Sequence, residues 1–384
     1  MGFGAAWITP VALKRIAAEA GDLRSVPALA GALVWLGIGF GGIALAWAAE
    51  RVGVRWTAIG GALMIGIGLA LSTLGPGWPL YVGHGLFIGF LGIAGLNAPL
   101  YVYVCKWFDF RRGSALALIS SGAYIAGALW PPAFEPLIAH IGWRQTMLLY
   151  AGVQIALIVP LAAVFFGQPP EQTFAAIASD GTAARRQVLG SPPNLIFAFI
   201  AAASFLCCVP MAIPQAHLIA YCGDIGISAA RGAVMLSVLL GVAFISRQAW
   251  GWIADRIGGL RTALIGSACQ TVTMTGFLLA QDEIGLFSVA ALFGFSFSGL
   301  VAAYVLSLRE LFPPAEASWR IPTLLLISGG GMAAGGWIGG LLYDYFGFYA
   351  PAFAAGILFG MLNLAVLAWL VWQQRRASEL PAGA

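Results

Sequence analysis

One arginine stands at a depth where charge is costly. Arg247 interrupts an apolar run that continues to Ile253, and it lies eight residues before Asp255, which is about 12 Å along a helix. A guanidinium this deep in a bilayer costs several kcal/mol unless it faces a wet cavity or a partner. Because guanidinium binds a carboxylate through two parallel hydrogen bonds, the spacing predicts a binding site for an organic anion. Snorkelling of the side chain to the membrane surface is the alternative.

Polar side chains near the middle of other apolar runs are the candidate neighbours of this arginine. They are Asn97, Tyr124 and Gln154. A plain hydrogen bond between helices is the alternative for each of them. No nucleophile, base and acid come together in the pattern, and the cysteines and histidines lack the spacing of metal ligands. We therefore expect no enzyme, no metal and no cofactor.

A second group of charged residues follows the helix of Arg247 in a tight turn. The candidate gate residues are Gly251, Asp255, Arg256, Gly258, Glu50, Arg51, Arg111 and Arg112. A carboxylate and a guanidinium at a helix end can pair with the N-terminus of a neighbouring helix in one conformation and release it in another. We expect such a gate here, and a tight, positively charged loop is the alternative.

Composition shows what kind of element must position these residues. Of the 384 residues, 9% are charged and 60% are hydrophobic, whereas soluble domains are about 25% charged. A soluble globular protein is therefore excluded, and the lipid bilayer is an expected partner. A net charge of +4 without a basic stripe excludes nucleic acid as a partner.

The number of long charge-free runs predicts the number of membrane spans. They cover residues 26–49, 56–105, 113–134, 145–170, 187–223, 232–246, 262–281, 284–308, 321–343 and 345–374. A turn at residues 75–79 divides the second run, so eleven full spans are expected. Residues 1–13 are apolar but cover only about 20 Å as a helix, and we expect this first helix to be incomplete in the sequence.

The chain repeats itself. Ala49–Gly53 recurs as Ala254–Gly258 at an offset of 205 residues (255 − 50), and two further matches have nearly the same offset. The repeat predicts two similar helical bundles related by an axis along the membrane normal. The expected division is an N-terminal bundle at 1–166, a linker at 167–193, a C-terminal bundle at 194–372 and a tail at 373–384.

Basic residues predict the orientation. One side would carry Arg51, Arg55, Lys106, Arg111, Arg112, Arg185, Arg186, Arg247, Arg256, Arg261, Arg309, Arg320, Arg375 and Arg376, which are 14 of the 19 Lys and Arg residues. The positive-inside rule makes that side cytoplasmic. We expect a multi-pass protein of the inner (plasma) membrane with a cytoplasmic C-terminus.

These motifs resemble a known family. The turn Gly251–Gly258 resembles the Gly-x-x-x-Asp-Arg-x-Gly signature of the major facilitator superfamily, with Ala46 and Glu50 as departures in the first copy. Lys106–Ala117 and Ile245–Gly251 resemble the monocarboxylate and oxalate/formate branch, in which the eighth helix carries an arginine for substrate carboxylates. Some carriers of this branch have an acidic residue one turn before that arginine, but this position is Ala243 here. Dicarboxylate carriers have a lysine on the eleventh helix, and residues 321–343 contain none.

The resemblance implies an all-α membrane protein with two six-helix bundles that transports by alternating access. The expected function is secondary-active or facilitative transport of a small organic anion, a monocarboxylate in the first instance, by a monomer. An exporter of drugs or other small metabolites and a sensor that keeps the fold without transporting are the alternatives.

Overall fold

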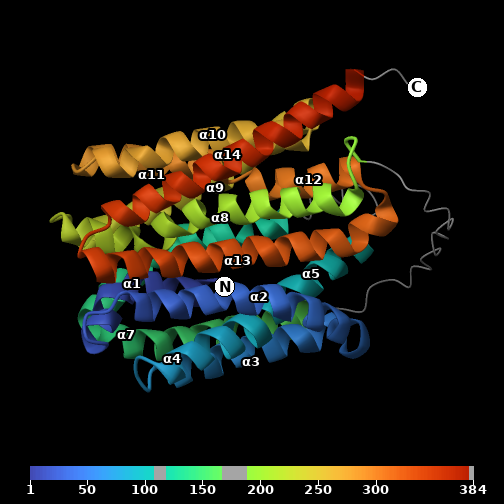
Figure 1. The fold of residues 1–384 in the computed structure, drawn as a ribbon. Coiled ribbons are helices and arrows are strands. Elements are labelled where there is room, and N and C mark those ends of the chain that lie inside the picture. Colours follow the sequence, from blue (N-terminus) through green and yellow to red (C-terminus); the bar gives the residue numbers. More distant parts are fainter. Residues whose placement is uncertain (108–117, 167–187, 380–384) are drawn as a thin grey trace.

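The computed structural model describes residues 1–107, 118–166 and 188–379, and their regular structure is helical (Figure 1). The elements are α1 (Gly4–Glu19), α2 (Ser25–Val52), α3 (Val54–Ser72), α4 (Trp78–Val82), the π-helical segment η1 (Gly83–Ile93), α5 (Ala94–Trp107), α7 (Gly122–Phe165), α8 (Pro193–Asp224), α9 (Ala229–Ile257), α10 (Gly259–Leu279), α11 (Glu283–Phe297), α12 (Leu300–Leu311), α13 (Pro314–Phe346) and α14 (Ala350–Glu379). The predicted all-α class is confirmed.

The helices are long enough to cross a bilayer. Within the described ranges, ten helical stretches have the required length and apolar composition. One of them, Leu118–Phe165, turns back at Gly142, where φ is 84° and ψ is 163°, and so supplies two crossings. The eleven full spans expected from the charge-free runs are therefore present.

Successive crossings alternate in direction, so the turns gather at two ends of the molecule (Figure 1). We call one end the linker end, and it contains the turns at residues 52–54, 188–193, 257–259 and 311–314. We call the opposite end the far end, and it contains the turns at residues 19–25, 72–78, 142, 224–229, 279–283 and 346–350. The C-terminal end of α14 lies at the linker end.

The sequence repeat is visible in the backbone. Gly53 and Gly258 have φ angles of 91° and 84°, and Gly142 and Gly347 have φ angles of 84° and 81°. Both pairs are 205 residues apart (258 − 53 and 347 − 142). Only glycine adopts this left-handed region without strain, so the chain reverses direction at equivalent points of the two halves.

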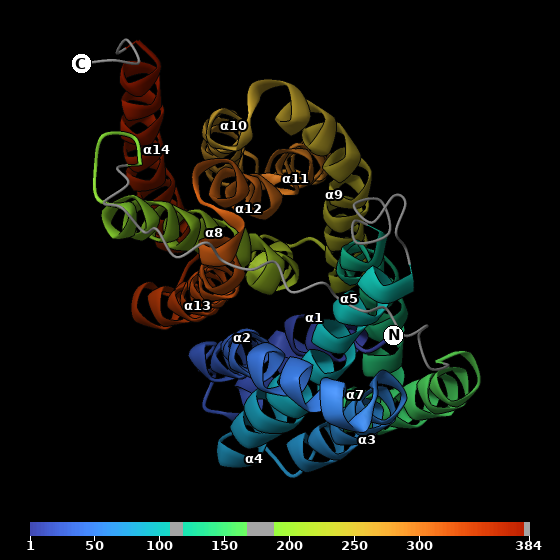
Figure 2. The same cartoon turned by 90° about the vertical axis from the view of Figure 1, so that its right-hand side faces the viewer.

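The two halves lie side by side. Viewed from the linker end, α1 to α7 occupy one side of the molecule and α8 to α14 the other (Figure 2). Across the seam between them α2 packs against α13, α7 against α9 and α1 against α8. At an offset of 205 residues α2 corresponds to α9, and the first part of α7 to α13, so the two longest contacts of the seam are equivalent by the repeat.

Small residues allow close approach within the second half. A methyl group at Gly331 or Gly335 of α13 would overlap the backbone carbonyls of Phe205 and Val209 in α8. The glycine spacing of four residues in α13 therefore serves helix packing.

Candidate substrate site and gates

Arg247 lies at the seam between the halves. It projects from α9, is half-buried, and its Cζ lies 5.5 Å from the centre of the Tyr124 ring of α7. It also interacts electrostatically with the phenol of Tyr101 in α5. Both tyrosines belong to the first half, so one charge of the second half faces two phenols of the first.

The face of α9 beside Arg247 is fixed to its own half. The Ser246 and Ser298 hydroxyls are 2.7 Å apart, and the Trp250 indole donates a 2.6 Å hydrogen bond to the carbonyl of Phe295. These contacts set the rotation of α9 about its axis. They leave Arg247, next to Ser246, directed toward the first half.

The surroundings of Tyr124 reach two more helices of the second half. Its ring centre lies 6.1 Å from that of Phe297 in α11, and the thiols of Cys207 and Cys208 in α8 lie in the neighbourhood of its hydroxyl. Tyr124 is thus the predicted neighbour that the structure does bring to Arg247. In the part of the chain that the structure describes, no carboxylate forms an ion pair with Arg247.

The other two predicted neighbours differ from each other. Asn97 is half-buried in α5, one helical turn before Tyr101 and therefore on the same face. Gln154 is fully buried between α7 and α3, where its Nε2 donates a 2.7 Å hydrogen bond to the Ala62 carbonyl and its Oε1 has no partner. The contacts of Gln154 lie inside the first half and do not reach Arg247.

At the linker end the predicted gate residues are exposed. Asp255, Arg256, Glu50 and Arg51 all face outward, and none of them forms an ion pair across the seam within the described ranges. Each arginine instead covers a tryptophan one turn earlier on its own helix, Arg51 at 3.9 Å from Trp47 and Arg256 at 3.5 Å from Trp252. Arg111 and Arg112 lie outside the described residues, as does most of Lys106–Ala117.

A carboxylate that the sequence analysis did not single out holds the turn after α9. Glu310 of α12 accepts hydrogen bonds from the backbone N–H of Gly259, with a 3.0 Å distance to Oε2. Gly259 begins α10, so this carboxylate caps a helix N-terminus and compensates its partial positive charge. The bond lies inside the second half. Glu310 therefore caps α10 within its own half, and the gate role of Asp255 stays a prediction.

At the far end charged groups do bridge the halves. The Arg24 guanidinium donates two hydrogen bonds to Asp224, from Nη1 to Oδ2 at 2.5 Å and from Nη2 to Oδ1 at 2.7 Å. Lys14 adds a 3.0 Å contact to Oδ1 of the same carboxylate. Arg24 also lies over the Tyr343 ring, 3.5 Å from its centre. We call Lys14, Arg24, Asp224 and Asp344 the far-end latch.

The last member of the latch caps α2. Asp344 of α13 accepts hydrogen bonds from the backbone N–H groups of Arg24 and Ser25, at 2.7 Å and 2.9 Å. Ser25 begins α2, so a carboxylate of the second half neutralises a helix N-terminus of the first. Because the chain has so few charges, the basic and acidic residues beside these turns were the feature of the sequence that could have indicated the latch.

A related pair stays inside the first half. Arg144 donates to both carboxylate oxygens of Glu19, at 2.7 Å and 2.5 Å, and the Trp143 indole donates to Oε1 at 2.9 Å. These hydrogen bonds, that of Arg144 foremost, lower the pKa of Glu19. The pair ties α1 to α7.

The buried histidines are satisfied by neighbours. The His84 ring lies 2.6 Å from the Thr9 hydroxyl and 3.0 Å from that of Ser72. The His217 ring lies 2.7 Å from the Gly336 carbonyl and 3.1 Å from the Tyr349 hydroxyl. Within the described ranges, no three His, Cys, Asp or Glu side chains are placed to hold a metal ion.

Two similar bundles of long apolar helices that meet at a seam define the class of two-bundle membrane transporters. A family model described as Major Facilitator Superfamily matches residues 1–318. The chain belongs to the Major Facilitator Superfamily. It is therefore a multi-pass membrane transporter rather than an enzyme.

Curated relatives of low sequence identity are also named as transporters. The chain is 24% identical over 298 residues to an MFS-type transporter of Gibberella moniliformis, with 76% of this chain and 69% of that protein covered. It is 23% identical over 328 residues to Monocarboxylate transporter 13 of Bos taurus, with 83% and 74% covered.

Solved structures share the fold. A bacterial homolog of the human lysosomal transporter Spinster, in an inward-facing and occupied conformation, superposes with a TM-score of 0.72 at 14% identity, covering 97% of this chain and 94% of the other. A POT family transporter in complex with 5-aminolevulinic acid has a TM-score of 0.69 at 12% identity, covering 97% and 94%.

Proposed function

We propose that this transporter carries a small organic anion, in the first instance a monocarboxylate, by alternating access. The observation that carries the proposal is Arg247, a half-buried guanidinium at the seam with no carboxylate partner among the described residues. The carboxylate of a bound anion would neutralise the positive charge of this guanidinium. The name of the relative from Bos taurus points to the same substrate class.

Phenols complete the proposed site. Tyr101 and Tyr124 come from the first half, and their hydroxyls can donate to a carboxylate that Arg247 holds from the second half. Asn97, one turn from Tyr101, is the next candidate ligand. A ligand held by both halves interacts differently with them when they rotate, which is the requirement for coupling binding to a conformational change.

The structure also suggests which state is present. Charged groups join the halves at the far end and none joins them at the linker end within the described ranges. With the linker end cytoplasmic, as the basic residues indicate, this is an inward-facing state. The two bundles, 1–166 and 194–372, would rotate as bodies within a monomer in the inner membrane, with the C-terminus in the cytoplasm.

Binding to three purified proteins tests the proposal. A panel of mono- and dicarboxylates and lipophilic cations is titrated into the wild type, Arg247→Lys and Arg247→Gln. Arg247→Gln loses charge-assisted hydrogen bonds worth about 2 to 4 kcal/mol, or roughly 30- to 1000-fold in affinity. Arg247→Lys keeps the charge but loses the planar fork, so its affinity falls less.

A matched control removes a charge elsewhere. Arg261 is exposed on α10 at the linker end, so Arg261→Gln should bind carboxylates like the wild type. Tight binding of cations by the wild type, or carboxylate binding unchanged in Arg247→Gln, rejects the anion proposal and supports an exporter of other small molecules. Binding without counterflow of radiolabelled anion in proteoliposomes supports a sensor.

A further inference from the structure

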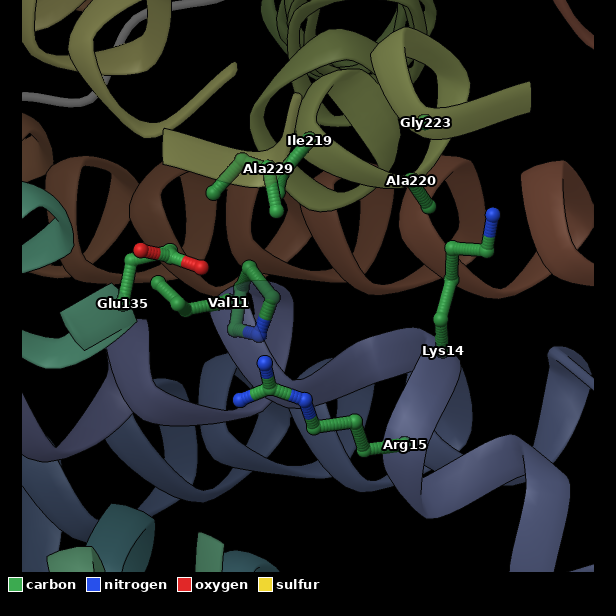
Figure 3. A pocket seen from close by; sticks show the side chains of 9 residues that line it. Val11, Lys14, Arg15, Glu135, Ile219, Ala220, Gly223 and Ala229 are labelled. Carbon is green, nitrogen blue, oxygen red and sulfur yellow. The ribbon is translucent and has the colours of Figure 1, made fainter. Parts of the chain in front are cut away.

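A second candidate site lies at the far end of the seam. A partly open cavity of about 220 Å³ lies there between helices of both halves (Figure 3). The residues of its lining that matter here are Val11, Lys14, Arg15, Glu135, Ile219 and Ala229. Ala229 and Arg247 are 18 residues apart in α9, about 27 Å of helix. The cavity is therefore separate from the Arg247 site.

The cavity has the chemistry of an anion site. Three charged side chains line it, Lys14 and Arg15 of α1 and Glu135 of α7, and together they carry one net positive charge. Val11 and Ile219 supply buried apolar walls. Because Lys14 is already paired with Asp224, one small monocarboxylate would bind first to Arg15 and place its carbon chain against these walls.

Arg15 is available for a ligand. In Figure 3 its guanidinium extends along the cavity on the side of Glu135, whereas the Lys14 ammonium points toward Gly223. No ion pair joins Arg15 to Glu135, or to any other carboxylate in residues 1–107, 118–166 and 188–379.

Lys14 connects this cavity to the latch. Its Nζ lies 3.0 Å from Asp224, and its side chain is 47% exposed, compared with 8% for that of Arg24 on the same carboxylate. Lys14 makes one contact where Arg24 makes two. It is therefore the partner of Asp224 that a competing anion displaces more readily.

We propose that this cavity is a far-end anion site, in which Arg15 and Lys14 bind a small carboxylate. Binding draws Lys14 away from Asp224 and so loosens the far-end latch before the anion reaches Arg247. The ligand class rests on the proposed function, but the site does not depend on Arg247. Glu135 repels a second carboxylate, so the site favours monocarboxylates over dicarboxylates.

Protection of an introduced cysteine tests the site. Ala229→Cys places a thiol in the cavity wall, and a membrane-impermeant maleimide is added at the far end with or without pyruvate. Pyruvate should slow the modification at least threefold, and tetramethylammonium, a cation of similar size, should not. The protein without the new cysteine gives the background rate.

Four variants, each combined with Ala229→Cys, separate the outcomes. Arg15→Gln should abolish protection by pyruvate, and Arg15→Lys should restore part of it. Arg231→Gln, which removes a far-end arginine paired with Glu283 that does not line the cavity, should leave protection intact. Protection should also persist in Arg247→Gln, even though that variant loses the central site.

A kinetic measurement covers the case in which Ala229→Cys does not fold. In the otherwise native protein, Arg15→Gln should raise the half-saturating pyruvate concentration at the far end about tenfold and leave that at the linker end unchanged. The inference is overturned if pyruvate gives no protection, if tetramethylammonium protects equally, or if both sides change alike. Protection lost only in Arg247→Gln would also overturn it, while supporting the central site.

Discussion

The two ends of the molecule use their charges in different ways. At the far end Arg24 of the first half is bound to Asp224 of the second, and Asp344 of the second half caps α2 of the first. At the linker end Glu310 caps a helix of its own half, and Arg256 covers a tryptophan of its own helix. Charges that bridge halves oppose their separation, whereas charges that bind within a half do not. In residues 1–107, 118–166 and 188–379, charged groups therefore tie the halves together at the far end and not at the linker end.

The repeat shows how the difference arises. Glu19 and Asp224 end equivalent helices and are 205 residues apart (224 − 19). Glu19 is bound by Arg144 of its own half, but the equivalent of Arg144 is Tyr349 (349 − 144 = 205). Asp224 therefore has no arginine at that place in its own half, and it binds Arg24 across the seam instead. The internal tie of the first half is thus replaced in the second by a bond across the seam, in which Arg24 and Lys14 reach Asp224.

Asp224→Asn should give the largest effect. It leaves the Arg24 guanidinium, 8% exposed, without a carboxylate, and a partly buried pair of this kind contributes on the order of 2 kcal/mol. The far end should therefore open about 30-fold more often. The measurement is modification of Ala28→Cys, a buried seam position facing Gly340, by an impermeant maleimide.

Glu19→Gln is the matched control for this experiment. It removes the equivalent carboxylate of the first half but touches no group that bridges the seam. The rate of Ala28→Cys modification should stay within twofold of the starting protein. Equal rates in Asp224→Asn and Glu19→Gln would show that the latch does not hold the far end closed.

Glu310→Gln should have a smaller effect, on stability and not on the seam. The loss of a charged cap at the start of α10 costs about 1 kcal/mol, which lowers the melting temperature by a few degrees. Glu50→Gln, an exposed carboxylate at the linker end of the first half, is the control and should melt with the wild type. Melting of Glu310→Gln at the wild-type temperature would contradict the capping role.

The sequence predicts the spans and the repeat because these depend on length and on apolar composition. It also identifies Arg247, because a charge deep in an apolar run stands out regardless of the fold. The position of a polar residue along an apolar run does not, however, show which neighbouring helix its side chain faces. Gln154 lies near the middle of its apolar run in the sequence, yet the rotation of α7 directs it to Ala62 of α3. Only the packed helices determine which polar groups share the seam.

The latch could not be predicted from sequence for a related reason. Arg24 is 200 residues from Asp224 and 320 from Asp344, and each stands beside a turn, where charged residues are ordinary. Their pairing depends on how the halves meet. The turn at Asp255 has a signature spacing and is therefore conspicuous in the sequence, although in this state its carboxylate is exposed.

Asp255→Asn sharpens the comparison from the linker end. Because Asp255 is exposed here, its substitution should change stability by no more than about 0.5 kcal/mol. Transport should still slow, since the gate hypothesis requires this charge when the linker end closes. Melting temperature and pyruvate counterflow are measured on the same preparation. Loss of folding in step with transport would favour a purely structural turn.

The pair of Glu19 and Arg144 should give the smallest effect, visible only in its pH dependence. Arg144 holds the pKa of Glu19 below its ordinary value, so the folded protein releases this proton more readily than the unfolded chain. The resulting stability is fully present above the unfolded pKa, about 4.3, and is lost as the pH falls through the lower folded pKa. Since the Glu19 side chain is 37% exposed, the contribution is a few tenths of a kcal/mol.

A double-mutant cycle isolates this contribution. Melting temperatures of the wild type, Glu19→Gln, Arg144→Gln and the double variant are measured between pH 7 and pH 3. Each single substitution should remove the same part of the wild-type decrease at low pH, because either one breaks the pair, and the double variant should add nothing further. An equal decrease at low pH in the wild type and in Glu19→Gln would show that the pair contributes no stability.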